Sequence, residues 1–594
     1  MSSPDLVLLH APSVYDFRQE MILYGPLADY AALPYALEQY PPSYTALGAY
    51  LEHAGYRVQM LNLAKHMLAD PTFDVEQAIA ALEPVAFGID LHWLAHAQGA
   101  LAVAQLVKTC HPRTPVILIG LAATYYHREL MNYPQVDYVL RGESNQGALM
   151  QLLQSLLLGQ TPDQVSGVTW RNRLGNVVEN PLHEGEATAD IEASEEWHGK
   201  FDNGDSSWPA CLPFVRHFEG PFASAAVARG CTHACTICNN SAYAGQRLWG
   251  RGAPTFRSPE RLADDLLVLR RRRSGAIQVV GDLRQMGMEY AYRFLHAVRG
   301  FSSLVGLDLL QPAPRQFLEE IKARLPHVAL VIPIHSHDPE IRRVLGKDYD
   351  NASIEQTIGD ALALGFKRVH LYFTIGLPRQ DRASVDATLT YCGELLARFK
   401  SNGRLQPFVA PLMPFLDPGS MAFEEPERTG YRLLYHNLEE HRRALLMPSW
   451  KYVLNYETEA MTRHDIVQAT YDATKAMARL RAKHDLLTSQ RAKETEAAVE
   501  QVQRLMFEID QAIELWGVDQ VQDHMRVLKP SIDRLNRAGR WWPSWTTQGV
   551  DSGSAHYVDR SNVLQTIPRA LTAGWSGMKR WWRAQGNHAA RRKE

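Results

Sequence analysis

Three of the chain's six cysteines, Cys231, Cys235 and Cys238, lie within eight residues in the order C-x3-C-x2-C. Three thiolates can hold a [4Fe–4S] cluster while its fourth iron stays open to an exogenous ligand. A zinc site would need a fourth Cys or a His at a defined spacing, and none follows in the local pattern. Three unrelated surface thiols would be easily oxidised. The spacing therefore predicts an iron–sulfur cluster with one open coordination position.

The elements around the cysteines indicate an α/β fold. The small apolar residues 222–228 predict a buried strand, so the cysteines follow a strand's C-terminal end, where α/β proteins build their active sites. Further strands are expected at 276–281, 306–310, 328–335, 367–376 and 405–410, with helices at 259–271, 289–298 and 314–325. Six strand–helix units form an open, partial barrel.

The N-terminal third shows the same alternation. Strands are expected at 6–10, 56–63, 85–92, 115–119 and 136–140, and helices at 45–54, 75–82 and 99–110. This order predicts a doubly wound parallel sheet that binds ligands beyond the strand C-termini. The loops expected there are 11–13, 90–93, 120–124 and 141–144.

Composition narrows the class of protein. A chain of 594 residues, 46% of them hydrophobic, is long enough for two to four domains. Its net charge of −3 argues against nucleic acid as the main partner.

No stretch approaches 18 uncharged apolar residues, so we expect no transmembrane segment. The N-terminus does not resemble a signal peptide, and an exposed iron–sulfur loop needs a reducing compartment, so we expect a cytoplasmic protein. Cys110 and Cys392 are expected to be packing residues.

The cysteine motif, preceded by Arg229-Gly230 and a strand, resembles the radical S-adenosylmethionine (SAM) superfamily, in which the open iron chelates SAM. The preceding sheet resembles the cobalamin-binding domain of the B12-dependent branch. The resemblance implies an α/β fold: a Rossmann-like cobalamin-binding domain (1–200), a partial (β/α)6 radical SAM barrel (215–425), a mainly helical C-terminal cap (426–535) and a basic, Trp-rich tail (536–594).

The resemblance places SAM at three turns. Gly281 and Asp282 stand where the family usually has Gly-Gly-Glu, which holds the SAM amino group; one glycine is missing, and Asp replaces Glu. The alternative is an Asp that caps the following helix. Gly376 lies in a turn resembling the one near adenine. The expected SAM contacts after the third cysteine are Asn239, Asn240 and Ser241, which replace Gly-Gly-Ser.

The resemblance places cobalamin beyond the N-terminal sheet. Gly120, Thr124, Gly142 and Glu143 match turns that approach the corrin and its nucleotide tail. The other expected cobalamin contacts lie in two further loops and are Ser13, Asp90, Leu91, His92 and Trp93.

Two histidines could lie against the face of the corrin that points toward the sheet. Asp90 to Ala95 nearly spells D-x-H-x-x-G, whose histidine binds cobalt in cobalamin-dependent mutases. However, it follows the third strand rather than the first, and Ala95 replaces the glycine, so His92 is not expected to bind cobalt. His66 either approaches the same face or is a solvated helix residue.

Helices are expected at 431–446 and 466–513 of the C-terminal cap. Trp450, Tyr452 and Tyr456 either shape a substrate cavity or belong to the core. The basic tail is expected to be loosely docked, with a peripheral membrane contact as the alternative.

The family resemblance implies a C-methyltransferase that moves a methyl group from SAM through methylcobalamin to a carbon of a small molecule, with an external electron donor. The class includes the tryptophan 2-C-methyltransferase of thiopeptide antibiotic biosynthesis, and L-tryptophan at indole C2 is the preferred acceptor. The alternatives are a pyrrole, a hopanoid or other lipid, a cobalamin-dependent rearrangement, and a non-catalytic sensor of cobalamin and the cluster. The intact cysteine trio argues against the sensor.

Overall fold

The structure is a computed structural model that describes residues 3–26, 42–142, 145–182, 223–249, 251–272, 276–517, 520–521 and 525–538. The predictions for Glu143, for the tail after residue 538 and for the domain boundaries at 200 and 215 lie outside these residues. The described residues all belong to one compact unit. No helix in the described ranges is both long and apolar enough to cross a bilayer.

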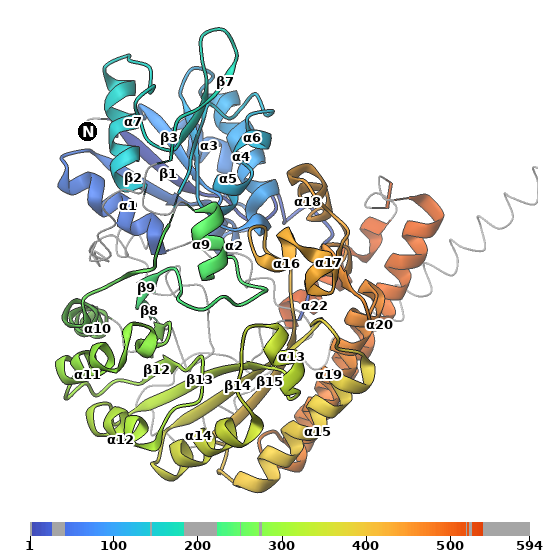
Figure 1. Cartoon of the computed structure of the whole chain (residues 1–594). Coiled ribbons are helices and arrows are strands. Elements are labelled where there is room, and N and C mark those ends of the chain that lie inside the picture. Colours follow the sequence, from blue (N-terminus) through green and yellow to red (C-terminus); the bar gives the residue numbers. More distant parts are fainter. Residues whose placement is uncertain are drawn as a thin grey trace, which may run out of the picture. The chain divides into compact units, whose positions relative to one another are not determined.

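The first domain is a seven-stranded sheet in the order β2-β1-β3-β4-β5-β6-β7, with helices on both faces (Figure 1). All five predicted strands are present and parallel, with their neighbours in register. They are β1 (Leu6–His10), β2 (Val58–Asn62), β3 (Ala86–Asp90), β4 (Val116–Ile119) and β5 (Tyr138–Leu140). Because the strand order reverses between β1 and β3, the crevice for a ligand opens beyond the carboxyl ends of these two strands.

Two further strands of this sheet were not predicted. After α7 (Gln146–Leu157), β6 (Val168–Arg171) and β7 (Val177–Glu179) form a hairpin that is antiparallel to β5. Both strands are short, and β7 is an edge strand with little burial, so its sequence has no apolar alternation to detect. The helices that connect the parallel strands are α1 (Pro42–His53), α2 (Leu63–Ala69), α3 (Val75–Ala80), α4 (Ala97–Cys110), α5 (Leu121–Tyr125) and α6 (His127–Leu130).

The second domain is a six-stranded, all-parallel sheet in the order β15-β14-β13-β12-β11-β8, which confirms the partial barrel (Figure 1). The strands are β8 (Ala223–Ala226), β11 (Ile277–Val280), β12 (Val305–Asp308), β13 (Val328–His335), β14 (Arg368–Ile375) and β15 (Leu405–Pro411). The helices that follow the strands are α9 (Ala242–Leu248), α10 (Pro259–Arg272), α11 (Met288–Ala297), α12 (Arg315–Arg324), α13 (Pro339–Val344), α14 (Asn351–Ala363) and α15 (Arg382–Phe399).

The barrel strands separate two environments by alternation. On β14, Val369, Leu371, Phe373 and Ile375 are buried in the main core. Tyr372 and Thr374 alternate with them and are only partly buried. The same holds for β13, where His335 is among the partly buried positions. The inner face of the barrel is therefore the more polar and more accessible face, as a binding site requires.

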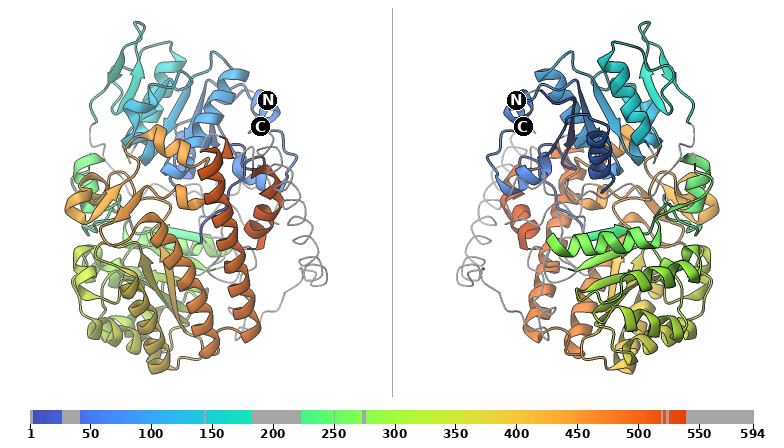
Figure 2. Two further views of the ribbon diagram at one scale, coloured as in Figure 1. Left: turned by 90° about the vertical axis from the view of Figure 1, so that its right-hand side faces the viewer. Right: turned by 90° about the vertical axis from the view of Figure 1, so that its left-hand side faces the viewer.

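The C-terminal region corrects one prediction and refines another. Residues 431–446 are not one helix: β16 (Tyr431–Leu433) pairs with β17 (Tyr456–Thr458), and only α18 (Leu438–Ala444) is helical. The predicted helix at 466–513 is two helices, α19 (Arg463–Lys483) and α20 (Ser489–Trp516), which lie side by side (Figure 2). Thr488 caps α20 and accepts from Arg491 N, which separates the two helices.

Trp450 and Tyr456 belong to the core, one of the two interpretations weighed from the sequence. Trp450 is buried and donates to Tyr471 Oη at 2.8 Å, and the buried Tyr456 donates to Leu412 O at 2.7 Å. Residues after β15 also join the two domains, because Phe415, Leu438 and Val453 pack in the core of the first domain.

Candidate functional site

The cysteine loop follows β8 and the short β9 (Ala228–Arg229), as predicted. Backbone bonds fold it tightly: Cys238 N donates to Cys235 O at 3.2 Å, and Ser241 N donates to Cys238 O at 3.3 Å. Thr236 ties the loop to the segment after α13, since its hydroxyl donates to Val344 O at 2.6 Å. All three cysteines are partly buried free thiols.

The charges around the cysteines suit an anionic cluster. Burial raises the pKa of the Cys238 thiol to about 12 and also raises the pKa values of Cys231 and Cys235. The buried Lys347, whose ammonium donates to Pro333 O at 2.6 Å, lies close enough to all three thiols for mutual attraction. Binding to iron would ionise the thiols, and their negative charge would balance this buried cation. The sequence pattern did not single out Lys347.

Among the described residues, no three His, Cys, Asp or Glu side chains converge on a position for a single metal ion. A [4Fe–4S] cluster does not need such a position, because each of its cysteine thiolates binds a different iron atom.

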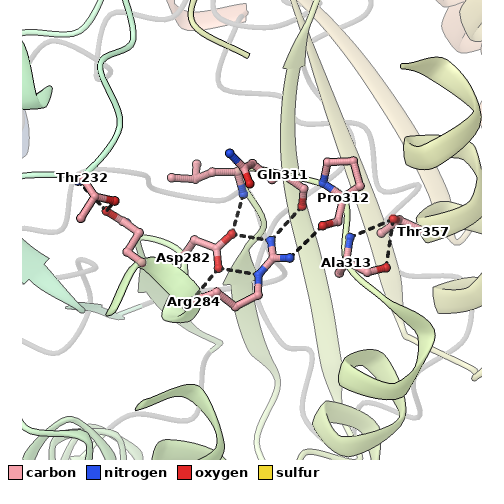
Figure 3. Close-up of polar contacts among 9 residues, drawn as sticks. Thr232, Asp282, Arg284, Gln311, Pro312, Ala313 and Thr357 are labelled. Carbon is pink, nitrogen blue, oxygen red and sulfur yellow. Dashed lines mark hydrogen bonds and ion pairs between the residues drawn. The ribbon is translucent and has the colours of Figure 1, made fainter. Parts of the chain in front are cut away.

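Asp282 caps the turn that follows β11, the alternative weighed from the sequence. Its carboxylate accepts from Arg284 N at 3.0 Å and forms an ion pair with the Arg284 guanidinium at 2.6 Å. It also accepts from Leu310 N at 2.9 Å, while Arg284 reaches the carbonyls of Gln311 and Pro312 (Figure 3). The carboxylate thus has protein partners on both oxygens, and its contact with SAM remains a prediction.

The other predicted SAM residues lie around the cysteine loop and at the end of β14. Asn239 O accepts from Trp249 Nε1 at 2.7 Å, and Ser241 caps α9. Asn240 Oδ1 is buried and has no hydrogen-bond partner among the described residues, as expected of a group that meets a bound ligand. Gly376 has φ of +92°, and a Cβ there would stand 2.3 Å from Tyr456 Oη. Only glycine fits this turn.

Asp308 is a candidate site residue that the sequence pattern did not indicate. It ends β12 and accepts from Gly281 N and from Gln278 Nε2, both at 2.8 Å. Burial raises the pKa of Asp308 to about 6. The carboxylate therefore lies beside the predicted SAM turn, where an ammonium group would stabilise its charged form.

Replacing Asp308 with asparagine is expected to change how stability depends on pH. Because the folded-state pKa exceeds the ordinary value of 3.8, the contribution of Asp308 to stability is fully present below about pH 4 and is lost as the pH rises through 6. The Asp308→Asn variant lacks this loss, so its free energy of unfolding should gain up to about 3 kcal/mol on the wild type between pH 4 and 7. Urea midpoints of the cofactor-free chain at several pH values test this. The exposed Asp348→Asn is the control, and equal pH profiles for the wild type and D308N would contradict the prediction.

The hydroxyl group of Thr124 joins two of the predicted cobalamin turns. Thr124 Oγ1 donates to Gly120 O at 2.8 Å and accepts from Gly142 N at 3.1 Å, so the turns after β4 and β5 meet. Gly120 has φ of +133°, and a Cβ there would stand 2.5 Å from the backbone of His92. The turns after β3 and β4 are therefore in close contact at the carboxyl edge of the sheet.

The Gly120→Ala substitution should cost about 2–4 kcal/mol, because both the backbone strain and the clash with His92 must be relieved. We expect cobalamin to bind at least about tenfold more weakly, since 1.4 kcal/mol already corresponds to this factor. Titration of the full chain with hydroxocobalamin measures the affinity. Gly159→Ala is the matched control, since Gly159 also has a positive φ, of +64°, but open space around it. Equal affinities of the two variants would refute the prediction.

The remaining predicted cobalamin residues lie around the crevice. Ser13 is buried, and its carbonyl accepts from Gly99 N in α4 at 3.1 Å. Leu91 is also buried in the core of the first domain. Trp93 Nε1 donates at 3.3 Å to Asp417, a residue that follows β15. His66 stacks on Phe73, with ring centroids 4.9 Å apart. The contact between Trp93 and Asp417 brings the loop after β3 next to the barrel.

The comparisons with known proteins agree with this geometry. The B12 binding domain family matches residues 32–149, and the radical SAM superfamily matches residues 226–392. The cytidylyl-2-hydroxyethylphosphonate methyltransferase of Streptomyces wedmorensis is 23% identical over 467 residues, which are 70% of this chain and 85% of that protein.

Two solved structures share the fold. The radical SAM methyltransferase TsrM of Kitasatospora setae, with tryptophan and a SAM analogue bound, has a TM-score of 0.50 at 16% identity, over 72% of this chain and 78% of its own. The cobalamin-dependent SAM radical enzyme OxsB, with aqua-cobalamin and SAM bound, has a TM-score of 0.53 at 12% identity, over 91% of this chain and 79% of its own.

The chain thus combines a B12-binding domain with a radical SAM domain, as the sequence predicted. It is homologous to the cobalamin-dependent radical SAM methyltransferases, a class of SAM-dependent transferases. The two matched families are named for B12 and for SAM, and OxsB was solved with aqua-cobalamin and SAM bound. A cluster fits the cysteine loop and the buried Lys347 beside it, and SAM fits the Asn240 oxygen that has no partner among the described residues. Cobalamin fits the turns around Gly120.

Proposed function

We propose that the chain is a C-methyltransferase that moves a methyl group from SAM, by way of cobalamin, to a carbon of a small natural-product precursor. L-Tryptophan, at C2 of its indole, is the preferred acceptor. An external electron donor that maintains the cofactors in their reduced states is part of the proposal.

One observation on the barrel's inner face carries the preference for an aromatic acceptor. Tyr372 on β14 is partly buried and stacks on Phe408 of β15, with centroids 5.1 Å apart and planes at 16°. Phe408 in turn stacks on His370, with centroids 5.6 Å apart. Phe408 and His370 are buried, so Tyr372 is the ring of this stack that an acceptor can reach. A planar heterocycle against it would gain both buried area and ring contact.

Polar groups lie at the carboxyl ends of the neighbouring strands. His335 ends β13 and shares a hydrogen bond with Thr374 Oγ1 at 3.0 Å, and burial lowers the pKa of this imidazole to about 3. A neutral imidazole and the Thr374 hydroxyl can hold an amino acid's polar atoms without adding charge. TsrM, which shares this fold, was solved with tryptophan bound.

The test is an anaerobic assay of the full chain, reconstituted with iron, sulfide and hydroxocobalamin and supplied with reductant. Methyl-labelled SAM is offered with L-tryptophan, a pyrrole-2-carboxylate, a hopanoid or cytidylyl-2-hydroxyethylphosphonate, the compound named for the S. wedmorensis relative. Labelled 2-methyltryptophan supports the proposal. Label on another acceptor, or on cobalamin only, keeps the methyltransferase and refutes tryptophan. Deoxyadenosine without any transferred label favours the rearrangement and refutes methylation.

The Tyr372→Leu substitution tests in the same assay whether the acceptor binds at the aromatic stack. If tryptophan lies against the stack, the variant should raise KM for tryptophan about tenfold, because a stacked pair contributes about 0.5–1.5 kcal/mol beyond its buried area. Transfer of label from SAM to cobalamin should be unchanged. An unchanged KM for tryptophan would show that the acceptor lies elsewhere.

A further inference from the structure

A guanidinium group lies against the cysteine loop in a space that two glycines leave open. Arg251 follows α9, and its backbone N–H donates to Gly245 O at 3.0 Å. Gly230, which directly precedes Cys231, has φ of +83°, and a Cβ there would overlap the guanidinium carbon of Arg251. A Cβ at Gly245 would stand 2.6 Å from Arg251 Nη2. The guanidinium is therefore enclosed between the residue before the first cysteine and the helix after the third.

The glycine in α9 is unfavourable for the helix itself. Gly245 is a buried residue inside this helix, where glycine lowers helix stability relative to alanine. The close approach of Arg251, and not helix formation, accounts for glycine at this position. The fold thus keeps a space for this cation at some cost to the helix that carries it.

The enclosed charge lies close to the thiols. Arg251 is near enough to Cys231 to attract its thiolate, and its Nη2 atom is buried, so solvent and salt screen this charge less than that of an exposed arginine. Lys347 lies close to the same thiols, and Asp417 lies close to Cys238. A guanidinium, unlike an ammonium or a carboxylate, keeps its charge in proteins whatever its surroundings.

We propose that Arg251 raises the reduction potential of the cluster held by the three cysteines. When one electron passes from the external donor to the cluster, the cluster becomes more negative by one charge, and no bond forms or breaks. A fixed cation beside it stabilises the reduced form more than the oxidised form. A weaker donor can then deliver the electron. The inference rests on the cluster and the electron donor of the proposed function and is independent of the methyl acceptor.

The test is a redox titration of the full chain, reconstituted anaerobically with iron and sulfide and kept free of cobalamin and SAM. The reduced cluster is measured by its electron paramagnetic resonance signal and the oxidised cluster by its brown absorbance. At the wild-type midpoint potential, Arg251→Met should lower the ratio of reduced to oxidised cluster about tenfold, which is a shift of about 59 mV to lower potential for one electron. An unchanged midpoint in R251M that retains its iron overturns the proposal.

Two further variants separate the charge from the shape of the side chain. Arg251→Lys keeps the positive charge, so it should recover most of the shift. Arg247→Met is the matched control: Arg247 lies on α9, its side chain is 62% exposed and it pairs with Glu425, so its loss should change the ratio less than about twofold. A midpoint of R251K equal to that of R251M, or an equal shift in R247M, refutes the assignment to the Arg251 charge.

Gly245→Ala moves the charge without removing it. The new Cβ meets Nη2, the far end of a flexible side chain, so the guanidinium has to withdraw from the loop while α9 gains a better helix former. The midpoint should shift in the same direction as in R251M, but by less. A wild-type midpoint in G245A contradicts the proposal.

Iron content after desalting is measured for every variant. Where R251M does not retain iron, the midpoints of G245A and R251K decide. If neither R251M nor G245A retains iron, Arg251 is needed to form the loop rather than to set the potential, and the proposal is refuted. Because no acceptor is present in the titration, a failure of this inference is distinguished from a failure of the proposed methyl transfer.

Discussion

Replacing Cys231, Cys235 and Cys238 together by alanine is expected to reduce bound iron from about four atoms per chain to none and to abolish methyl transfer. The three thiols lie in one loop between β9 and α9. Without the cluster, the open iron that would chelate SAM is gone. Iron and sulfide assays and the brown absorbance of the anaerobically reconstituted protein measure the loss.

Cobalamin binding should survive in the triple variant, because the predicted cobalamin turns belong to a sheet with its own hydrophobic core. Cys110→Ala is the matched control: Cys110 is a partly buried free cysteine at the end of α4, outside the motif, and its loss should leave iron and cobalamin unchanged. If the triple variant retains iron, or if the wild type binds zinc and stays colourless, the cluster assignment is wrong. Loss of both cofactors would contradict the separation of the two sites.

Replacing Arg342 with methionine is expected to destabilise the radical SAM domain by about 3–5 kcal/mol. Arg342 is the largest fully buried side chain among the described residues. Its guanidinium donates to Ser336 O at 2.9 Å, to His337 O at 3.1 Å and to Tyr349 O at 2.8 Å. Methionine keeps much of the apolar volume but removes the donor of all three carbonyls, of which His337 O still accepts from Asn351 Nδ2.

The same substitution should also weaken retention of the cluster. The segment that Arg342 closes, residues 336–349, carries Lys347 and the Val344 carbonyl that binds Thr236 in the cysteine loop. Urea midpoints and iron content after desalting test both effects. Arg343→Met is the control, because Arg343 is exposed and solvent screens its ion pairs with Glu340 and Asp348. Equal midpoints for the two variants would refute the prediction.

Much of the architecture could be predicted because it follows from local patterns. The strands β1 and β13 have the predicted bounds, and the other predicted strands agree to within a few residues. Buried parallel strands are short continuous apolar runs, and amphipathic helices separate them, so periodicity alone identifies both. The hairpin of β6 and β7 and the pair of β16 and β17 escaped prediction because strands of only three or four residues are too short to show a periodic pattern.

By itself, the sequence determined the chemistry of the cluster and the order of the two domains. The C-x3-C-x2-C spacing is local, and three thiols within eight residues can hold a cubane in any fold that exposes them. Only the tertiary structure decided which distant side chains join them. The approach of Lys347 to the thiols, the position of Asp308 and the pairing of His10 and His92 through Asp90 depend on strand register and loop packing. These bring together residues as far apart in sequence as Cys231 and Lys347, which are 116 positions apart. Contacts of that separation leave no trace in local spacing, because the chain between them is free to vary.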